Sequence, residues 1–314
     1  MTPVKSALRS PLAVIAALAL IGSVVPRLVP DRESSYLLYV LFQAFLFLTL
    51  AQGWNLVAGY TGQISLGQPA FFGSGAYVTA MLWNAGWGGY FDPFTMLLSG
   101  VAAALLAILI GIPLLSRLRG IYFALGTLGL GEILKVIVIQ GGEITGGSSG
   151  LILPSGGYTS LTIYYYYSLA LSLFATLTVY LITKSRLGLA LVAVRDSETA
   201  AAASGINILK YKVGAFAFGA FFTGLCGNLQ AYYLFQVTAP SFFSLNWTLY
   251  PVIICVLGGV GNVTGPIVGA FVLTLLFEVS KEWLPMIHPM LSGILIILII
   301  LFLPGGILRA KLQK

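Results

Sequence analysis

The sequence has very little charge. Only 8% of its 314 residues are Asp, Glu, Lys or Arg, whereas an ordinary soluble domain carries about 25%. Hydrophobic residues make up 58% of the chain, and residues 213–277 contain no charged side chain. Because a water-soluble fold of this size needs a charged surface, the composition excludes one and indicates a membrane protein.

Histidine and cysteine are almost missing as well. The one histidine, His288, excludes a multi-histidine metal site, and the two cysteines, Cys226 and Cys255, lie in apolar segments where we interpret them as small hydrophobic residues. No glycine precedes a lysine, so the chain lacks the Gly-Lys pair of an ATP-binding loop. Without a nucleophile–base pair or a metal cluster, we expect no enzyme and no metal or cofactor bound by this chain.

Long apolar runs are abundant. Several approach the ~20 residues that a helix needs to cross a ~30 Å hydrocarbon core. Continuous runs, rather than short alternating segments, favour helices over a barrel. We therefore expect an all-α polytopic membrane protein forming a single membrane domain, 1–314, with about ten spans, some of them broken or re-entrant. The expected spans are approximately 12–29, 36–57, 68–84, 94–115, 121–139, 163–182, 213–233, 248–257, 266–279 and 289–303.

The basic residues indicate the orientation of these spans. If the N-terminus is cytoplasmic, 12 of the 16 basic residues fall on cytoplasmic connections, as the positive-inside rule requires. An even number of spans then puts both termini in the cytoplasm. The basic balance, with a pI of 9.4, is explained by these connections, so we expect no nucleic-acid partner.

Two glycine-rich segments interrupt the apolar pattern in the same way. The segments 59–65 and 258–264 both read G-x-x-G-[QN]-[IV]-[ST]. Paired breaks of this kind point to a transport site between internal repeats, because irregular backbone at membrane depth must line a cavity or be covered by protein. The alternative is a pair of plain cytoplasmic turns. The span count places both breaks on the same side, which implies a parallel repeat, although one miscounted re-entrant segment would make it inverted.

Neutral polar residues accompany the breaks. Such groups suit the path of a small, uncharged or zwitterionic, partly apolar solute, but amide side chains also cap the ends of broken helices. The candidate substrate-pathway residues are Asn55, Gln63, Ser65, Gln68, Asn262 and Thr264.

Glu132 and Lys135 are the charged pair inside an expected span. Each costs about 2.5–3.5 kcal/mol at a helix centre, and their i, i+3 spacing lets them pair. They are either part of a substrate path or gate, or a local ion pair facing a neighbouring helix.

One short stretch concentrates the charge. Residues 184–212 hold seven charged side chains between two apolar segments. Asp196 is a good helix N-cap and Gly205 a good helix stop, so we expect a short helix over 197–204. A connector that only reverses the chain needs a handful of residues. The length therefore favours a cytoplasmic loop that docks a soluble partner over a solvated connector.

These motifs together resemble a known family. The chain is similar to the LivM-type permease subunits of high-affinity branched-chain amino-acid ABC importers, and permeases of urea and short-amide importers share the pattern. The residues that carry the resemblance are Asn55-Leu56, 59–67, Phe71-Phe72-Gly73, Gly75-Ala76-Tyr77, 122–125, 132–135, Thr145-Gly146-Gly147, Arg186, Gly188, 193–196, Ala201-Ala202, Gly205-Ile206, Gly258-Gly259 and Gly265-Pro266.

The resemblance implies a multi-subunit importer in a bacterial inner membrane. Its other parts would be a second homologous permease, two cytoplasmic ATPases that bind ATP and Mg²⁺, and a periplasmic substrate-binding protein. The stretch 184–212 would dock an ATPase. The residues implied for this coupling are Arg186, Gly188, Arg195, Asp196, Glu198, Ala201 and Gly205.

The chain departs from the family pattern at three points. Gln68 stands where relatives often have His, and Leu189 where they often have Arg. Gly205 follows Glu198 by seven residues, whereas the general importer motif E-A-A-x-x-x-G has six. The alternative function is a stand-alone secondary transporter or channel for a small neutral solute.

Overall fold

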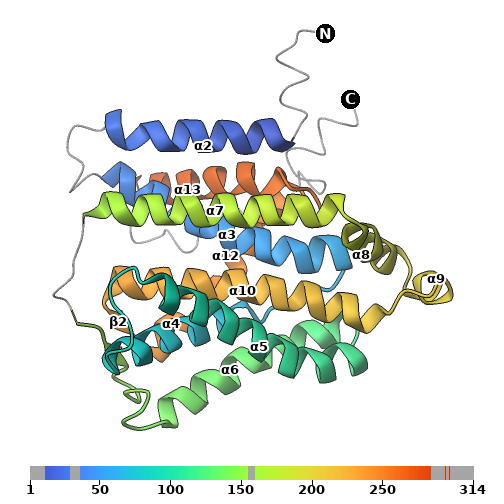
Figure 1. Cartoon of the computed structure of the whole chain (residues 1–314), viewed down its shortest axis with the longest axis horizontal. Coiled ribbons are helices and arrows are strands. Elements are labelled where there is room, and N and C mark those ends of the chain that lie inside the picture. Colours follow the sequence, from blue (N-terminus) through green and yellow to red (C-terminus); the bar gives the residue numbers. More distant parts are fainter. Residues whose placement is uncertain (1–10, 29–35, 155–159, 284–293, 295–296, 298–314) are drawn as a thin grey trace. The chain divides into compact units, whose positions relative to one another are not determined.

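The computed structural model describes residues 11–28, 36–154, 160–283, 294 and 297. In this part of the chain nearly all regular structure is helical (Figure 1). The helices are α2 (Pro11–Leu28), α3 (Tyr36–Thr61), α4 (Gln68–Asn84), α5 (Pro93–Arg117), α6 (Ile121–Gln140), α7 (Leu161–Lys184), α8 (Arg186–Asp196), α9 (Glu198–Ala203), α10 (Ile208–Leu234), α11 (Ala239–Phe242), α12 (Asn246–Gly258) and α13 (Gly265–Trp283). Two-residue strands, β1 (Leu151–Ile152) and β2 (Gln236–Val237), pair antiparallel.

The chain is an all-α, multi-pass membrane protein. Within the described residues, 7 helical segments are long and apolar enough to cross a membrane. They are Pro11–Leu28, Tyr36–Thr61, Pro93–Arg117, Ile121–Gln140, Leu161–Lys184, Ile208–Leu234 and Ala239–Gly258. Two further expected spans, 68–84 and 266–279, coincide with α4, which has 17 residues, and with the shorter apolar segment Gly265–Glu278 of α13. Of the tenth, 289–303, the structure describes only residues 294 and 297, and both chain termini lie outside the described residues, so the count of ten and the orientation stay predictions.

The chain folds as two compact units. The first comprises Met1–Asn55, Ser160–Leu181 and Tyr250–Lys314, and the second comprises Leu56–Thr159 and Ile182–Leu249. Helix α3 begins in the first unit and ends in the second. The first glycine-rich break follows α3 and belongs to the second unit, whereas the second break belongs to the first unit.

Aromatic side chains of α3 organise the first unit. The Phe45 ring contacts Tyr165 of α7 and Phe271 of α13 at centroid distances of 5.5 and 5.6 Å. Phe47 contacts Tyr250 of α12 at 5.0 Å. Such edge-to-face contacts add about 0.5–1.5 kcal/mol each beyond the area they bury. Helix α3 is therefore the central helix of this unit, with α7, α12 and α13 around it.

Small residues bring three helices of the second unit into backbone contact. A Cβ added to Gly75 of α4 would lie 2.3 Å from the carbonyl oxygen of Gly224 in α10, and one added to Gly227 would lie 2.1 Å from that of Phe72. Gly224 also abuts the carbonyl of Ser99 in α5, at 2.7 Å from an added Cβ. Close packing on small residues is the usual way in which helices associate in lipid. Helices α4, α5 and α10 therefore form the core of this unit.

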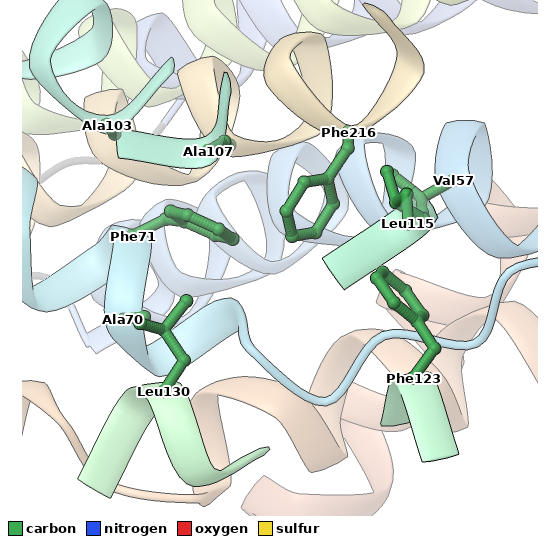
Figure 2. Packing of buried hydrophobic residues seen from close by; sticks show 10 residues of the cluster. Val57, Ala70, Phe71, Ala103, Ala107, Leu115, Phe123, Leu130 and Phe216 are labelled. Carbon is green, nitrogen blue, oxygen red and sulfur yellow. The ribbon is translucent and has the colours of Figure 1, made fainter. Parts of the chain in front are cut away.

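An apolar cluster surrounds the first break. Figure 2 shows the Phe216 ring of α10 among Phe71, Leu115 and Phe123. The ring centroid of Phe216 lies 5.1 Å from that of Phe71 and 5.7 Å from that of Phe123. Because Val57 before the break and Phe71 after it both belong to the cluster, packing fixes the helix ends on either side of the break.

Candidate functional site

The first break separates α3 from α4. Helix α3 ends at Thr61, residues 62–67 are not helical, and α4 begins at Gln68. Gly62 has φ +72°, a conformation that side chains with a Cβ rarely adopt. Pro69 follows at the start of α4, where its missing N–H costs nothing. The glycine and the proline thus specify where the helix stops and where the next one starts.

The far end of this break is fixed by hydrogen bonds. The backbone N–H of Leu66 donates to Thr127 Oγ1 of α6 at 3.0 Å, and the carbonyl of Leu66 accepts from Thr248 Oγ1 at 2.9 Å. Gly67 lies close to α6, because an added Cβ would be 3.0 Å from the carbonyl oxygen of Thr127. The backbone N–H and carbonyl of Leu66 are therefore satisfied by hydroxyl groups of α6 and α12.

Three candidate pathway residues lie at the first break. Ser65 Oγ accepts a hydrogen bond from the N–H of Gly67 at 3.2 Å, and Gln68 Oε1 accepts one from Thr223 Oγ1 in the middle of α10. Gln63 is buried, and its Oε1 has no hydrogen-bond partner among the described residues. Ser65 and Gln68 thus already serve the backbone and a neighbouring helix, while Gln63 keeps an unused acceptor.

The second break, between α12 and α13, is held by amide side chains of α3. Asn55 Oδ1 accepts from the N–H of Gly261 at 2.8 Å, and Asn55 Nδ2 donates to the carbonyl of Asn262 at 2.9 Å. Gln52 Nε2 donates to the carbonyl of Val263 at 2.9 Å. Two amides from one helix therefore take over hydrogen bonds that the broken helix cannot make.

The other three candidate pathway residues meet at this second break. Asn262 Oδ1 accepts from the N–H and the hydroxyl of Thr264 at 3.1 and 3.0 Å, while Asn55 bonds the Asn262 backbone. The structure thus brings Asn55, Asn262 and Thr264 together in the first unit and gathers Gln63, Ser65 and Gln68 in the second. Their role in a substrate path stays a prediction.

Glu132 and Lys135 lie on one face of α6. Lys135 Nζ is 3.4 Å from Glu132 Oε2, with side-chain exposures of 30% and 59%. Because the pair is this exposed on the chain, it is not part of the packed core of the second unit. An exposed i, i+3 pair contributes little in water, so the pair's importance depends on what covers this face of α6.

The charged stretch 184–212 contains two short helices, α8 and α9, between the end of α7 and the first turn of α10. Ser185 Oγ caps α8 by accepting from the N–H of Leu187 at 3.1 Å, and Ser197 Oγ caps α9 by accepting from that of Ala200 at 3.3 Å. The expected N-cap at Asp196 was wrong, because Asp196 ends α8 and its carboxylate binds Arg195. Gly205, at φ +80°, does follow the end of α9.

The other residues implied for coupling are Arg186 and Gly188 at the start of α8 and Ala201 in α9. Gly188 allows the sharp turn from α7 into α8, since an added Cβ would lie 2.5 Å from the carbonyl oxygen of Ile182. Ala201 is the buried residue of α9, whereas Arg186 is exposed at the start of α8. Among these residues, Arg186 is available to contact a soluble partner.

Two contacts bind α8 and α9 to the rest of the second unit. Arg195 Nη1 donates to the carbonyl of Gly59, near the end of α3, at 3.1 Å. Lys212 Nζ lies 2.6 Å from Glu198 Oε1, and the Lys212 side chain is only 2% exposed. A buried ammonium needs its partner carboxylate. Glu198 therefore anchors α9 to the first turns of α10, in addition to any contact with a partner.

Sequence reasoning missed several residues that this geometry uses. Within the charged stretch, Lys212 pairs with Glu198. Gln52 and Thr127 each bond a break, and Thr223 bonds Gln68 at the start of α4. A buried hydrogen bond also joins Asn228 to Thr79 at 2.8 Å. One signal could have found Gln52 and Asn228, because amides inside otherwise apolar spans need a hydrogen-bond partner. Thr127 and Thr223 carry no such signal, since hydroxyls commonly bond their own helix.

The part of the chain that the structure describes offers no cluster of three or more His, Cys, Asp or Glu side chains that would suit a metal ion. Apart from the Arg195 guanidinium on the carbonyl of Gly59, the polar side chains described at the two breaks are neutral amides and hydroxyls. This chemistry can bind and pass a polar solute, but it supplies no acid, base or nucleophile.

Comparisons with known proteins agree with this chemistry. The chain matches the family described as "Branched-chain amino acid transport system / permease component" over residues 36–303. It is 31% identical over 294 residues to the "High-affinity branched-chain amino acid transport system permease protein LivM" of Escherichia coli (strain K12), covering 84% of this chain and 68% of that protein. The protein of the same name from Salmonella typhimurium gives the same values.

A more distant relative is the "Probable branched-chain amino acid transport permease protein LivM" of Methanocaldococcus jannaschii, 25% identical over 245 residues and covering 69% of each chain. No solved structure gives a significant match. The family match nevertheless spans nearly all of the described helices. The chain therefore belongs to the branched-chain amino acid transport permease family, and it is a transport protein and not an enzyme.

Proposed function

We propose that this chain is the translocating permease subunit of an ABC importer that carries branched-chain, hydrophobic amino acids inward. The observation that supports this most directly is the 31% identity to the LivM permease over 84% of the chain. The neutral, hydrogen-bonding residues at the two breaks suit a zwitterionic solute with an apolar side chain. The chain acts as one membrane permease domain, 1–314, with ten spans and both termini in the cytoplasm of a bacterial inner membrane.

Partner chains supply the ATP chemistry. The stretch 184–212 offers capped helices α8 and α9 with the exposed Arg186, and the sequence lacks a Gly-Lys loop of its own. We infer a complex with a second homologous permease, two cytoplasmic ATPases that bind ATP and Mg²⁺, and a periplasmic binding protein that delivers the amino acid. The proposed path is lined by Asn55, Gln63, Ser65, Gln68, Asn262 and Thr264.

Reconstitution in liposomes tests this proposal. Co-expressed ATPases are expected to co-purify with the chain, and radiolabelled leucine uptake is expected only with the ATPases, the binding protein and ATP present together. Leucine uptake by the chain alone would contradict the proposal and favour a stand-alone secondary transporter or channel. Uptake of urea or a short amide in place of leucine, in the full complex, would reassign the substrate and keep the importer.

A further inference from the structure

The C-terminal end of α3 receives a cation from the charged stretch. The last four carbonyl groups of a helix have no partner within the helix, and this end carries partial negative charge. Arg195 Nη1, on α8, donates to one of these carbonyls, that of Gly59, at 3.1 Å. Thr61 Oγ1 donates to the carbonyl of Val57, two residues before Gly59, at 2.6 Å. The end of α3 at the first break is thus held by a residue 136 positions away in the sequence.

The Arg195 side chain is fixed in this position. Its Nε donates to Asp196 Oδ1 at 3.0 Å, and its Nη2 lies 3.0 Å from the same oxygen. Its stem packs on the break, because a Cβ added to Gly62 would be 3.1 Å from Arg195 Cγ and 3.7 Å from Arg195 Cα. The contact therefore includes the backbone of α8, and Gly62 leaves the space for it.

Helix α8 is a short helix, separated from α7 and from α9 by one non-helical residue on each side. Single capping serines, Ser185 and Ser197, connect it to α7 and to α9. Its buried residues are Gly188, Ala190, Leu191 and Val194, which leave the opposite face of the helix exposed. The far end of the break is held differently, by Thr127 and Thr248 on Leu66. A displacement of α8 would thus move the near end of the break relative to the far end.

We propose that Arg195 is a positioning residue that links partner docking on α8 to the first break. When the ATPases change state, α8 shifts, and Arg195 carries the Gly59 carbonyl and Gly62 with it while Leu66 stays on α6. The conformation of residues 62–67, and with it the start of α4, then follows the state of the ATPases. This inference rests on the proposed function, because it requires that the ATPases dock on the stretch 184–212.

The test uses the complete importer with its ATPases and binding protein in liposomes. Arg195→Gln removes the charge and the planar fork that binds Gly59 and Asp196 together, whereas Arg195→Lys keeps the charge but not the fork. Arg119→Gln removes an exposed arginine from the connection between α5 and α6 and is the matched control. The measured quantities are ATPase co-purification and the number of ATP molecules hydrolysed per leucine imported.

We expect Arg195→Gln to retain the ATPases but to raise the ATP used per leucine by at least about fivefold, the low end of typical coupling between sites. Arg195→Lys is expected to fall between this variant and wild type, and Arg119→Gln to match wild type. An unchanged ratio in Arg195→Gln overturns the inference. Loss of the ATPases from Arg195→Gln alone also overturns it, because Arg195 would then be a docking residue. Failure of the wild-type chain to bind ATPases would instead refute the proposed function.

A second measurement needs no variant, so it holds even if Arg195→Gln fails to fold. Hydrogen exchange is followed in the wild-type complex with and without a non-hydrolysable ATP analogue. The inference predicts that amides of residues 62–65 change their exchange rate together with those of α8. A change confined to α8, with none at residues 62–65, would overturn it.

Discussion

The two glycine-rich breaks have the same sequence pattern and a similar backbone turn, but they are held by different means. Gly62 and Gly261 occupy the same position in the pattern and have φ +72° and +75°. The second break is closed tightly, because a Cβ on Gly258 would lie only 1.9 Å from the carbonyl oxygen of Gly265. At Gly62 in the first break, the nearest atom to an added Cβ is a side-chain atom, Arg195 Cγ, at 3.1 Å.

The side chains that hydrogen-bond the two breaks also differ. The second break is bonded by Gln52 and Asn55, which are short, buried side chains of one continuous helix. The first break has one end on hydroxyls inside the second unit and the other on a partly exposed arginine of a surface helix. One motif therefore serves two purposes: the second break is a fixed turn, and the first is a turn whose geometry depends on α8.

The largest expected loss of stability comes from adding a methyl group at the second break. Gly258→Ala should cost about 3 kcal/mol or more, because main-chain atoms cannot move aside. Gly62→Ala should cost only about 1–2 kcal/mol, for the left-handed conformation of that residue. Thermal unfolding of the purified proteins in detergent measures both, with Gly129→Ala as a control because nothing lies within 4 Å of its added Cβ. Equal losses in the two breaks would contradict the comparison.

Next in size is the buried ion pair of the charged stretch. Glu198→Ala leaves the Lys212 ammonium, 2% exposed, without its carboxylate, at a cost of about 3 kcal/mol. Hydrogen exchange should speed up over residues 186–212 and at the first break, but not over residues 259–264. The double variant Glu198→Ala, Lys212→Met should recover most of the stability. A double variant as unstable as the single one would show that the pair does not cause the loss.

Asn55→Ala is expected to act on the second break alone. It leaves the N–H of Gly261 and the carbonyl of Asn262 without their partner, which costs about 2 kcal/mol. Exchange of the Gly261 amide should accelerate, while that of Leu66 in the first break stays at the wild-type rate. Gln140→Ala, at an exposed position of α6, is the control. Acceleration at both breaks would mean that the two are not held independently.

The smallest effect is expected at the far end of the first break. Thr127→Val keeps the shape of the side chain but removes the hydroxyl that accepts from the N–H of Leu66, at a cost of about 1 kcal/mol. The melting temperature should fall slightly, and the Leu66 amide should exchange faster. An unchanged exchange rate for Leu66 would show that Thr127 does not hold this end.

Local sequence signals predicted the helices and the breaks well. Helix α4 begins and ends where the apolar run 68–84 does, because Gly67 precedes it and Pro69 opens it. The glycines at 62 and 261 take the left-handed conformation that their residue type permits. Helix α8 was not predicted, and Ser197 rather than Asp196 caps α9, because Asp196 is already engaged by its neighbour Arg195.

The partners of the breaks could not be predicted from the sequence. Asn55 and Gly261 are 206 residues apart, and Arg195 and Gly59 are 136 apart. No local pattern encodes such pairs, because they depend on which helix faces come together. A buried amide in an apolar span predicts that a partner exists, but only packing determines which backbone group it is.

The glycine contacts between α4 and α10 limit how the second unit can move. A slide of α10 by one helical turn would bring Thr223 or Ala231 to the place of Gly227, where an added Cβ already lies 2.1 Å from the carbonyl oxygen of Phe72. A slide of one turn between these helices is therefore sterically blocked, and we expect them to move by rotation as one rigid body. The axis of such a rotation has to lie where the chain is not helical, and at the start of α4 that is residues 62–67.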